Sequence, residues 1–395
     1  MKITRWIVAI AVLGMAVGCG QTTLQQTKAD ANRKWQETRA RMLCGVADEH
    51  LKVGQVDKAK LKVMEALAID SQYVPARMLL AKVYIEEGHY SGAINELNRL
   101  CLEQPADGEV VYLLAVAKEK DGQLAEALAD YRKAYAMDGK NIAAITAAAE
   151  VLVAMGQARD AQILLDSYMS QAGDDPAMHE LAGRVAAMLN EYAKALKHYQ
   201  QAHDLDYKNS LYVECIAKMQ FVLGQHAEAT DSLKDLLDKG RKDVWIHRML
   251  GDCYLATKRP AEARNEYQVI CDQSPNDVGA WTSLAKAALA GGDPQRVVLA
   301  SKTALQIDPR NLEAMLLQGY GLILCNDNEQ AVRVLSAAAA EHPKVSAIQC
   351  LLGKAHAACG NDAAAAKCFK AALNLEPENR VARELLSKTE KKITG

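Results

Sequence analysis

Apolar side chains recur along this chain with the spacing of amphipathic helices that are joined in pairs. In the stretch 278–311, the apolar residues at i, i+3, i+4 and i+7 predict one helix; they are Trp281, Leu284, Ala285 and Ala288. Gly292 follows, and glycine ends a helix because it takes the left-handed backbone without a Cβ clash. Pro294 suits the first turn of a second helix, where its missing N–H costs little. The stretch therefore predicts two helices joined by a short turn.

The same pattern repeats at a fixed interval along the chain. Four equally spaced prolines mark the interval near the C-terminus: Pro275, Pro309, Pro343 and Pro377. Stepping back in this phase from the last unit, 346–379, gives ten units that begin at Ala40 and end at Asn379. Position 20 of the unit is alanine in nine of the ten, and Val297 is the exception. A period of this length, built from helical segments, is typical of a stacked two-helix repeat.

Position 15 of each unit ends the first helix and favours residues that adopt a left-handed backbone. Glycine occupies it in most units, and Asn190 and Asn326 replace it in two. Lys258 breaks this rule in the seventh unit, where we expect Pro260 to close the turn instead. Small residues at positions 8 and 20 predict that these two positions face each other across the helix pair.

Two units show the repeat most fully. The matching residues are Leu250, Gly251, Tyr254, Ala263, Tyr267 and Pro275 in one, and Leu352, Gly353, Gly360, Ala365, Phe369, Ala372 and Pro377 in the other. This pattern resembles the tetratricopeptide repeat family. The resemblance implies an all-α protein, a right-handed α-solenoid of ten stacked two-helix repeats over 40–379. Residues 380–395 place Val381, Leu385 and Leu386 among charged residues, which predicts a C-terminal capping helix with one face in water.

Residues 1–18 have the pattern of an export signal. Lys2 and Arg5 precede a short apolar run, which is too short to span a membrane comfortably. The run ends in Ala16-Val17-Gly18-Cys19, which resembles the lipobox of bacterial lipoproteins and implies lipidation of Cys19. An ordinary signal peptide and an uncleaved anchor remain alternatives. Gly20 stands where a retained lipoprotein has Asp, so the resemblance implies the outer membrane, facing the periplasm.

Residues 19–39 are polar, and they predict a tether that becomes helical towards the first repeat. The whole chain carries 47 basic and 49 acidic residues, a balance that argues against a nucleic-acid surface. No phosphate loop, His-Glu-x-x-His pair, nucleophile elbow or dinucleotide fingerprint occurs. We therefore expect no enzyme activity, no cofactor and no metal.

Nine cysteines remain besides Cys19, in a compartment that would oxidise thiols. No Cys-x-x-Cys occurs, which argues against a metal site or a redox pair. Most of these cysteines are expected to fill small contacts between helices. Cys350 and Cys368 occupy positions 5 and 23 of the last repeat. These two numbers add up to the same total as the facing positions 8 and 20, which indicates the same level along two antiparallel helices. A disulfide between Cys350 and Cys368 is therefore a hypothesis.

The resemblance also implies a peptide-binding groove, since first helices of such repeats line the concave face through positions 2, 5, 9 and 12. Position 9 is basic in five of the ten repeats, and position 12 is largely apolar. The candidate groove residues are Lys82, Arg184, Lys218, Phe221, Trp245, Arg248, Lys286, Tyr320 and Lys354. We expect Lys218, Phe221, Trp245 and Arg248 to lie close together on adjacent first helices. Aromatic anchors would supply affinity and the cations would steer an acidic partner; alternatively, these charges merely solvate an exposed face.

These features favour a non-enzymatic adaptor, lipid-anchored in the bacterial envelope, that holds a protein or peptide partner during assembly of an envelope, pilus or secretion complex. An alternative is an accessory to polysaccharide synthesis and export, where the solenoid serves a glycosyltransferase. A third hypothesis is a thiol-dependent protein that uses its cysteines. The sequence leaves the identity of the partner, the pathway and the oligomeric state open.

Overall fold

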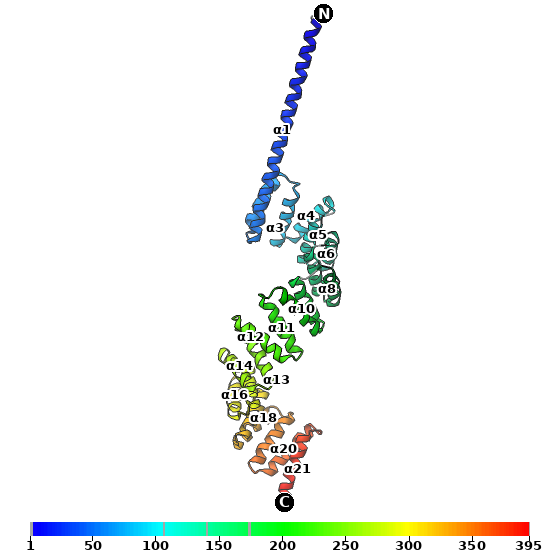
Figure 1. Cartoon of the computed structure of the whole chain (residues 1–395). Helices are drawn as coiled ribbons and strands as arrows, with labels where there is room; N and C mark the ends of the chain where they lie inside the picture. The colour runs from blue at the N-terminus through cyan, green and yellow to red at the C-terminus, as the bar shows by residue number, and fades with distance from the viewer. Residues whose placement is uncertain (1–2, 106, 140, 173–174, 395) are drawn as a thin grey trace. The chain divides into compact units, whose positions relative to one another are not determined.

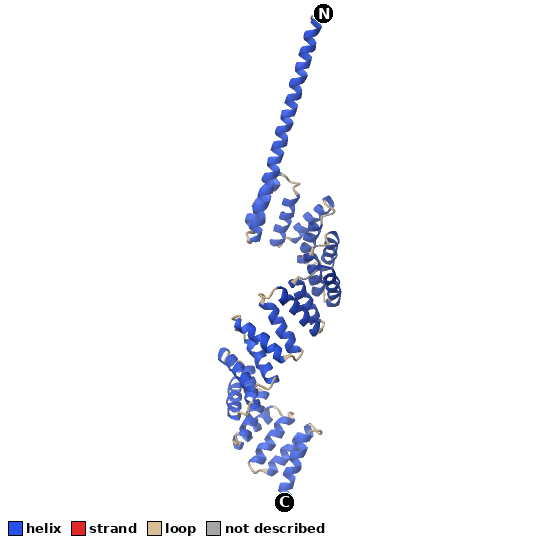
Figure 2. Cartoon of the chain, viewed as in Figure 1, coloured by secondary structure: helices blue, strands red, loops and turns tan. Residues whose placement is uncertain are grey.

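The structure, a computed structural model, describes residues 3–105, 107–139, 141–172 and 175–394, with the backbone alone for 3–25 and 170–172. Within this described part all regular structure is helical (Figure 2). The chain forms two compact units, Met1–Asn190 and Glu191–Gly395.

The first unit contains nine helices among its described residues (Figure 1). They are α1 (Ile3–Lys52), α2 (Val56–Ile69), α3 (Val74–Glu86), α4 (Tyr90–Glu103), α5 (Gly108–Lys120), α6 (Leu124–Met137), α7 (Ile142–Ala154), α8 (Ala158–Ala172) and α9 (Pro176–Met188). Each helix packs antiparallel to the next, as a helix pair joined by a short turn must.

The second unit contains twelve helices within the part that the structure describes. They are α10 (Tyr192–Leu205), α11 (Ser210–Val222), α12 (His226–Asp238), α13 (Val244–Ala256), α14 (Pro260–Gln273), α15 (Val278–Ala290), α16 (Pro294–Ile307), α17 (Leu312–Leu324), α18 (Asn328–Glu341), α19 (Ser346–Ala358), α20 (Asp362–Leu375) and α21 (Arg380–Thr394). In both units the odd-numbered helices from α3 onward begin at a constant interval, and so do the even-numbered helices. This interval equals the one between the four prolines, so the helices follow the period that the sequence predicts.

Every turn between the two helices of a repeat passes through a left-handed residue at position 15. Seven of these are glycines, and Asn190 and Asn326 have φ of 60° and 62°. Lys258 also adopts a φ of 60°, so the expectation that Pro260 closes this turn in another way was wrong. Pro260 instead starts α14, and the exposed lysine carries the cost of the left-handed backbone, about 1–2 kcal/mol for a residue with a Cβ.

Asparagine or aspartate at position 34 starts most of the following first helices. The Asn311 side chain accepts the Ala314 N–H at 3.0 Å, and Asn379 accepts the Ala382 N–H at 3.0 Å. Asp107, Asn141, Asp175, Asn209 and Asp277 cap their helices in the same way. Such caps satisfy N–H groups that the helix leaves free and stabilise it by about 1 kcal/mol each.

The core of each repeat lies between its two helices. The residue at position 20 is completely buried in all ten repeats, Val297 included. Position 8, however, faces position 24 rather than position 20. A Cβ added to Gly251 would lie 2.6 Å from the Tyr267 ring, and one added to Gly353 would lie 2.5 Å from the Phe369 ring. The facing rule inferred from small residues is thus corrected, because a glycine at position 8 makes room for the large side chain at position 24.

Helix α1 is longer than its repeat requires. Its backbone is helical from Ile3 through Lys52, so the predicted tether 19–39 is helical over its whole length and not only towards its end. Residues 21–39 contain no glycine or proline and many good helix formers, which explains the continuity. The side chains of residues 1–25, Cys19 included, lie outside those described. Among the described residues, no helix has the length and apolarity needed to cross a membrane.

Candidate protein-binding surface

In the second unit, consecutive first helices pack side by side from α13 through α15, α17 and α19 to the cap α21. Their positions 2, 5, 6, 9 and 12 project to one side, which we call the first-helix face. The predicted groove residues on these helices lie on this face because they occupy positions 2, 5, 9 or 12 of a helix whose start is set by the period. Lys218 and Phe221 occupy positions 9 and 12 of the preceding first helix, α11.

Two of the predicted residues meet across a repeat boundary. The Lys218 ammonium on α11 lies 4.9 Å from the ring centroid of Trp245 on α13. Trp245 is half-buried, and both it and Phe221 pack against the same apolar cluster, which includes Ile246 and Leu250. The Arg248 guanidinium, on the same helix as Trp245, donates to Asp277 Oδ2 at 2.6 Å. The face therefore presents a partly covered indole rather than a free one.

Most of the predicted cations have carboxylate partners within the chain. Lys218 pairs with Glu214 at 2.6 Å, and Lys286 pairs with Glu313 of the next repeat at 2.5 Å. In the first unit Lys82 pairs with Glu109 at 3.4 Å. Arg184 lies 3.4 Å from Glu150 and 3.8 Å from Glu180. Lys354 has no ion pair among the described residues.

These pairs change the predicted role of the cations. Lys82 with Glu109 and Lys286 with Glu313 each join position 9 of one repeat to position 2 of the next. Such exposed pairs add only about 0–1 kcal/mol to stability, yet each places a negative charge beside the cation. The paired cations are therefore partly neutralised by their neighbours, and their role in steering an acidic partner stays a prediction. The recurrence of a lysine at position 9 followed by a glutamate at position 2 of the next repeat was the signal in the sequence that could have indicated this.

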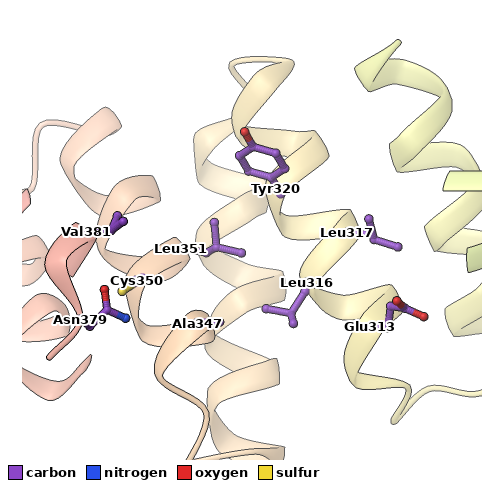
Figure 3. A pocket seen from close by; sticks show the side chains of 9 residues that line it. All are labelled: Glu313, Leu316, Leu317, Tyr320, Ala347, Cys350, Leu351, Asn379 and Val381. Atoms are coloured by element: carbon purple, nitrogen blue, oxygen red, sulfur yellow. The ribbon is translucent and has the colours of Figure 1, made fainter. Parts of the chain in front are cut away.

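A cavity of about 500 Å³ opens on the first-helix face between α17, α19 and the start of α21 (Figure 3). It is lined by Glu313, Leu316, Leu317, Tyr320, Ala347, Cys350, Leu351, Asn379 and Val381. These side chains come from α17, α19 and the start of α21, and Figure 3 shows that Leu316 and Leu351 face the space between α17 and α19. The lining is mostly apolar, as in sites that take an apolar side chain. Of these residues only Tyr320 is among the predicted groove residues. Position 6, which contributes Leu317 and Leu351, is not one of the positions expected to line the groove.

Cys350 and Cys368 are free thiols and lie in different clusters. Cys350 packs with Ala372 and Ala382, on the side of the repeat that faces α21. Cys368 packs against the cluster that contains Leu335 and Leu352, on the side that faces α18. The structure therefore does not bring the two cysteines of the hypothetical disulfide together.

The reason is visible at equivalent positions of other repeats. Position 23 faces positions 4 and 11, not position 5. His247 and Glu266, at positions 4 and 23, are joined at 2.7 Å, and Ser232 at position 23 donates to Gln220 at position 11 at 2.8 Å. The pairing of Cys350 with Cys368 rested on the facing rule that the core corrects.

The buried thiols are poorly suited to nucleophilic chemistry. Burial raises the pKa of Cys271 to about 12 and that of Cys253 to about 11. Burial also raises the pKa of Cys350, although the nearby Lys354 ammonium opposes this shift. A thiol reacts as its thiolate, which is scarce near neutral pH when the pKa is raised. Among the described residues no group of three or more His, Cys, Asp or Glu side chains could hold a metal ion.

The comparisons with known proteins agree with this architecture. The sequence matches one profile described as a tetratricopeptide repeat over residues 50–117, 120–185 and 223–288, and a second profile of that description over residues 326–380. These matches cover more than half of the chain, so the protein belongs to the tetratricopeptide repeat family. Its class is that of helical interaction scaffolds, and no catalytic family is indicated.

Curated relatives are distant and longer. The chain is 24% identical over 160 residues to anaphase-promoting complex subunit 3 of Schizosaccharomyces pombe, a match that covers 40% of this chain and 24% of that protein. It is 29% identical over 108 residues to the BBSome complex member BBS4 of Mus musculus, which covers 27% of this chain and 20% of that one. The chain therefore spans a quarter or less of the length of these relatives.

The chain is also similar, at low identity, to solved structures. The C-terminal part of a TPR repeat-containing protein from Cytophaga hutchinsonii is 16% identical, with a TM-score of 0.45 over 70% of this chain and 99% of that one. The MamA protein is also 16% identical, with a TM-score of 0.41 over 43% of this chain and 92% of that one.

Proposed function

We propose that this protein is a non-enzymatic scaffold that holds a protein partner on the first-helix face of its second unit, anchored in the bacterial envelope by a lipid on Cys19 and facing the periplasm from the outer membrane. In this role it would aid assembly of an envelope, pilus or secretion complex. The observation that carries the binding proposal is the apolar cavity between α17, α19 and α21.

The lining of this cavity defines the part of the partner that it would take. Leu316, Leu317 and Leu351 supply apolar surface, and Tyr320 adds an aromatic ring at the edge. Glu313 is already paired with Lys286, and the Asn379 amide is engaged with Ser346 and Glu376. The Glu313 and Asn379 side chains therefore have partners of their own, so we expect most of the affinity to come from burying an apolar side chain.

A leucine or an aromatic residue on an extended or helical segment would fit this chemistry. The half-buried indole of Trp245 lies on the same face, on α13, and offers a second apolar contact. Two such contacts along one face are typical of surfaces that bind a segment rather than a small molecule. The names of the curated relatives, both components of multiprotein complexes, support a scaffold role.

The lipid anchor rests on the match of Ala16-Val17-Gly18-Cys19 to a lipobox and on the apolar run before it. The polar helix that follows in α1 would hold the repeats away from the membrane surface.

Photo-crosslinking in cells tests the binding proposal. A photoreactive amino acid at Leu351, inside the cavity, should form adducts with one or a few proteins. The matched control is Leu299, an exposed leucine on the second helix α16, away from the first-helix face. Leu316→Glu, which places a charge in the cavity, should abolish the adducts at Leu351. Equal adducts from Leu351 and Leu299, or adducts that survive Leu316→Glu, would contradict the assignment.

A further inference from the structure

The N-terminal end of the repeat array leaves uncovered a helix face that every later repeat buries. Position 3 of the first helix is buried in all nine later repeats: Ala76, Val110, Ala144, Met178, Tyr212, Ile246, Ala280, Ala314 and Ile348. In the first repeat this position is Met42, and its side chain is 68% exposed. Val46 at position 7, the equivalent of the buried Leu250, is 45% exposed. No earlier repeat exists in the described chain to cover these side chains.

The other end of the array is closed. Helix α21 packs on α20, and Ala382, which stands at position 3 of this helix, is completely buried. Most of the remaining surface of α21 is charged and exposed, as expected of a cap, although Val381 and Ile393 are exposed as well. The two ends therefore differ: α21 covers the last repeat, whereas Met42 and Val46 stay exposed on the first.

The exposed face of α1 carries a regular seam. Trp35, Met42 and Val46 project from the side of α1 opposite the buried Ala40, Cys44 and Ala47, of which the last two pack against Val63 and Ala66 of α2. Val53 is the first residue after the helix, and it continues this line because its N–H still donates to the Glu49 carbonyl at 3.3 Å. Trp35 is 60% exposed and Val53 is 64% exposed. With Arg39 and Glu49 these residues are spaced 4, 3, 4, 3 and 4 apart, which is the a/d spacing of a coiled coil. An exposed seam of this spacing favours packing against another helix.

The residues of this seam are complementary to the same residues of a second copy of the chain that runs antiparallel. If two α1 helices pack antiparallel about a point level with Cys44, Trp35 lies opposite Val53 of the other copy and Met42 lies opposite its Val46. Arg39 then lies opposite Glu49 of the other copy, so each copy contributes one end of two equivalent ion pairs. A parallel pair would instead place Arg39 opposite Arg39 and Glu49 opposite Glu49, and like charges facing each other are unfavourable.

The existing contacts of the two charges do not prevent this pairing. Arg39 lies over the ring of its own Trp35 at 5.5 Å, and Glu49 has an exposed ion pair with Lys52 at 3.0 Å. Both contacts are on the surface and contribute about 0–1 kcal/mol, so either charge is able to turn towards a facing helix.

We propose that residues 35–53, the C-terminal part of α1 and the first residue after it, form an antiparallel two-fold interface with a second copy of this chain, in which Trp35, Met42, Val46 and Val53 supply the buried surface and Arg39 with Glu49 sets the orientation. This interface is independent of the first-helix face, so the protein would present two such faces per dimer. The seam is short, so we expect a dimer that dissociates on dilution.

Sedimentation of the full chain in mild detergent tests the proposal. The mass of the protein component, after correction for bound detergent, should rise from that of one chain towards that of two as the protein concentration increases. Arg39→Glu and Glu49→Arg should each raise the dissociation constant of the dimer by about tenfold or more, because each places like charges opposite each other. The double variant Arg39→Glu, Glu49→Arg should restore the original dissociation constant. Arg41→Glu, a charge reversal outside the seam, is the matched control and should change little.

Several outcomes would overturn the proposal. One is a chain that stays monomeric at every concentration. Another is an association that the single charge reversals do not weaken, as expected if the apolar run near the N-terminus causes it. A third is failure of the double variant to restore pairing, which would exclude the antiparallel arrangement. Co-flotation of a monomeric chain with phosphatidylglycerol vesicles, weakened by Arg39→Glu, would assign the face to a membrane surface instead. Circular dichroism of each variant shows that its helices are intact.

Discussion

The Lys218 ammonium lies 4.9 Å from the ring centroid of Trp245, so position 9 of one repeat covers position 2 of the next. A cation over an indole ring at a partly exposed site is worth about 0.5–1 kcal/mol. The contact also covers one face of the only tryptophan among the predicted groove residues. A partner that uses Trp245 must therefore contact the open part of the ring or displace Lys218.

Truncation of Trp245 should cost less stability than truncation of a core residue. Leu250→Ala removes a buried side chain and should lower the free energy of unfolding by about 2–5 kcal/mol. Trp245 is half-buried against the same cluster, so Trp245→Ala should lower it measurably but by less than Leu250→Ala. Leu299→Ala, at an exposed position, serves as the control. Urea denaturation of the three variants checks the order, and an effect of Trp245→Ala as large as that of Leu250→Ala would contradict it.

Replacement of Lys258 by glycine should stabilise the protein. Lys258 is held at a φ of 60°, where a residue with a Cβ costs about 1–2 kcal/mol, and glycine removes this cost. The expected gain in the free energy of unfolding is about 1 kcal/mol, reduced by the entropy that glycine loses on folding. Lys258→Ala retains the Cβ and should give no such gain, which separates the backbone effect from loss of the lysine side chain. Equal melting temperatures for the two variants would mean that this turn is not strained.

Cys350 and Cys368 should both be recovered as free thiols. Their side chains pack in different clusters, so the native fold does not hold them together for oxidation. Alkylation of the denatured protein without reductant, followed by peptide mass spectrometry, should give two separately alkylated peptides. Recovery of the two peptides joined by a disulfide would require a different packing of α19 against α20.

Cys19→Ser should abolish lipid labelling. The wild-type chain should incorporate a palmitate analogue, since the residue after the Ala-Val-Gly run carries the thiol that a lipobox provides. The variant should accumulate as precursor or as unanchored protein. Cys44→Ser, which changes a buried thiol of the first repeat, is a control that should leave labelling unchanged. Equal labelling of the Cys19 variant would refute the anchor.

Much of the fold was predictable because the constant period of the repeat specifies where each helix starts. The glycines at position 15 and the capping residues at position 34 are local signals, and local signals are readable without the third dimension. The facing of position 8 towards position 24 was missed, because small residues at two positions indicate close approach without saying which one opposes which.

The site was less predictable than the fold. Lys286 was identified but its partner Glu313 was not, because the pair joins two repeats whose relative placement depends on packing. The cavity was missed for a similar reason. Leu316 and Leu351 are ordinary apolar residues in the sequence, and they become a site only where α17, α19 and α21 leave space between them.

The repetition of turns also has a consequence for how such a gene can change. Among the described residues, the main contacts between helices join neighbours or next neighbours along the chain, and the repeats share the same left-handed turn and, in most cases, the same cap. An in-frame loss or duplication of the codons between two equivalent turns would therefore remove or add one whole repeat. At the new junction, the second helix of one repeat would still be followed by the first helix of another repeat, as it is throughout the array. The binding surface can therefore become longer or shorter by one repeat at a time, while the packing between neighbouring repeats stays of the same type.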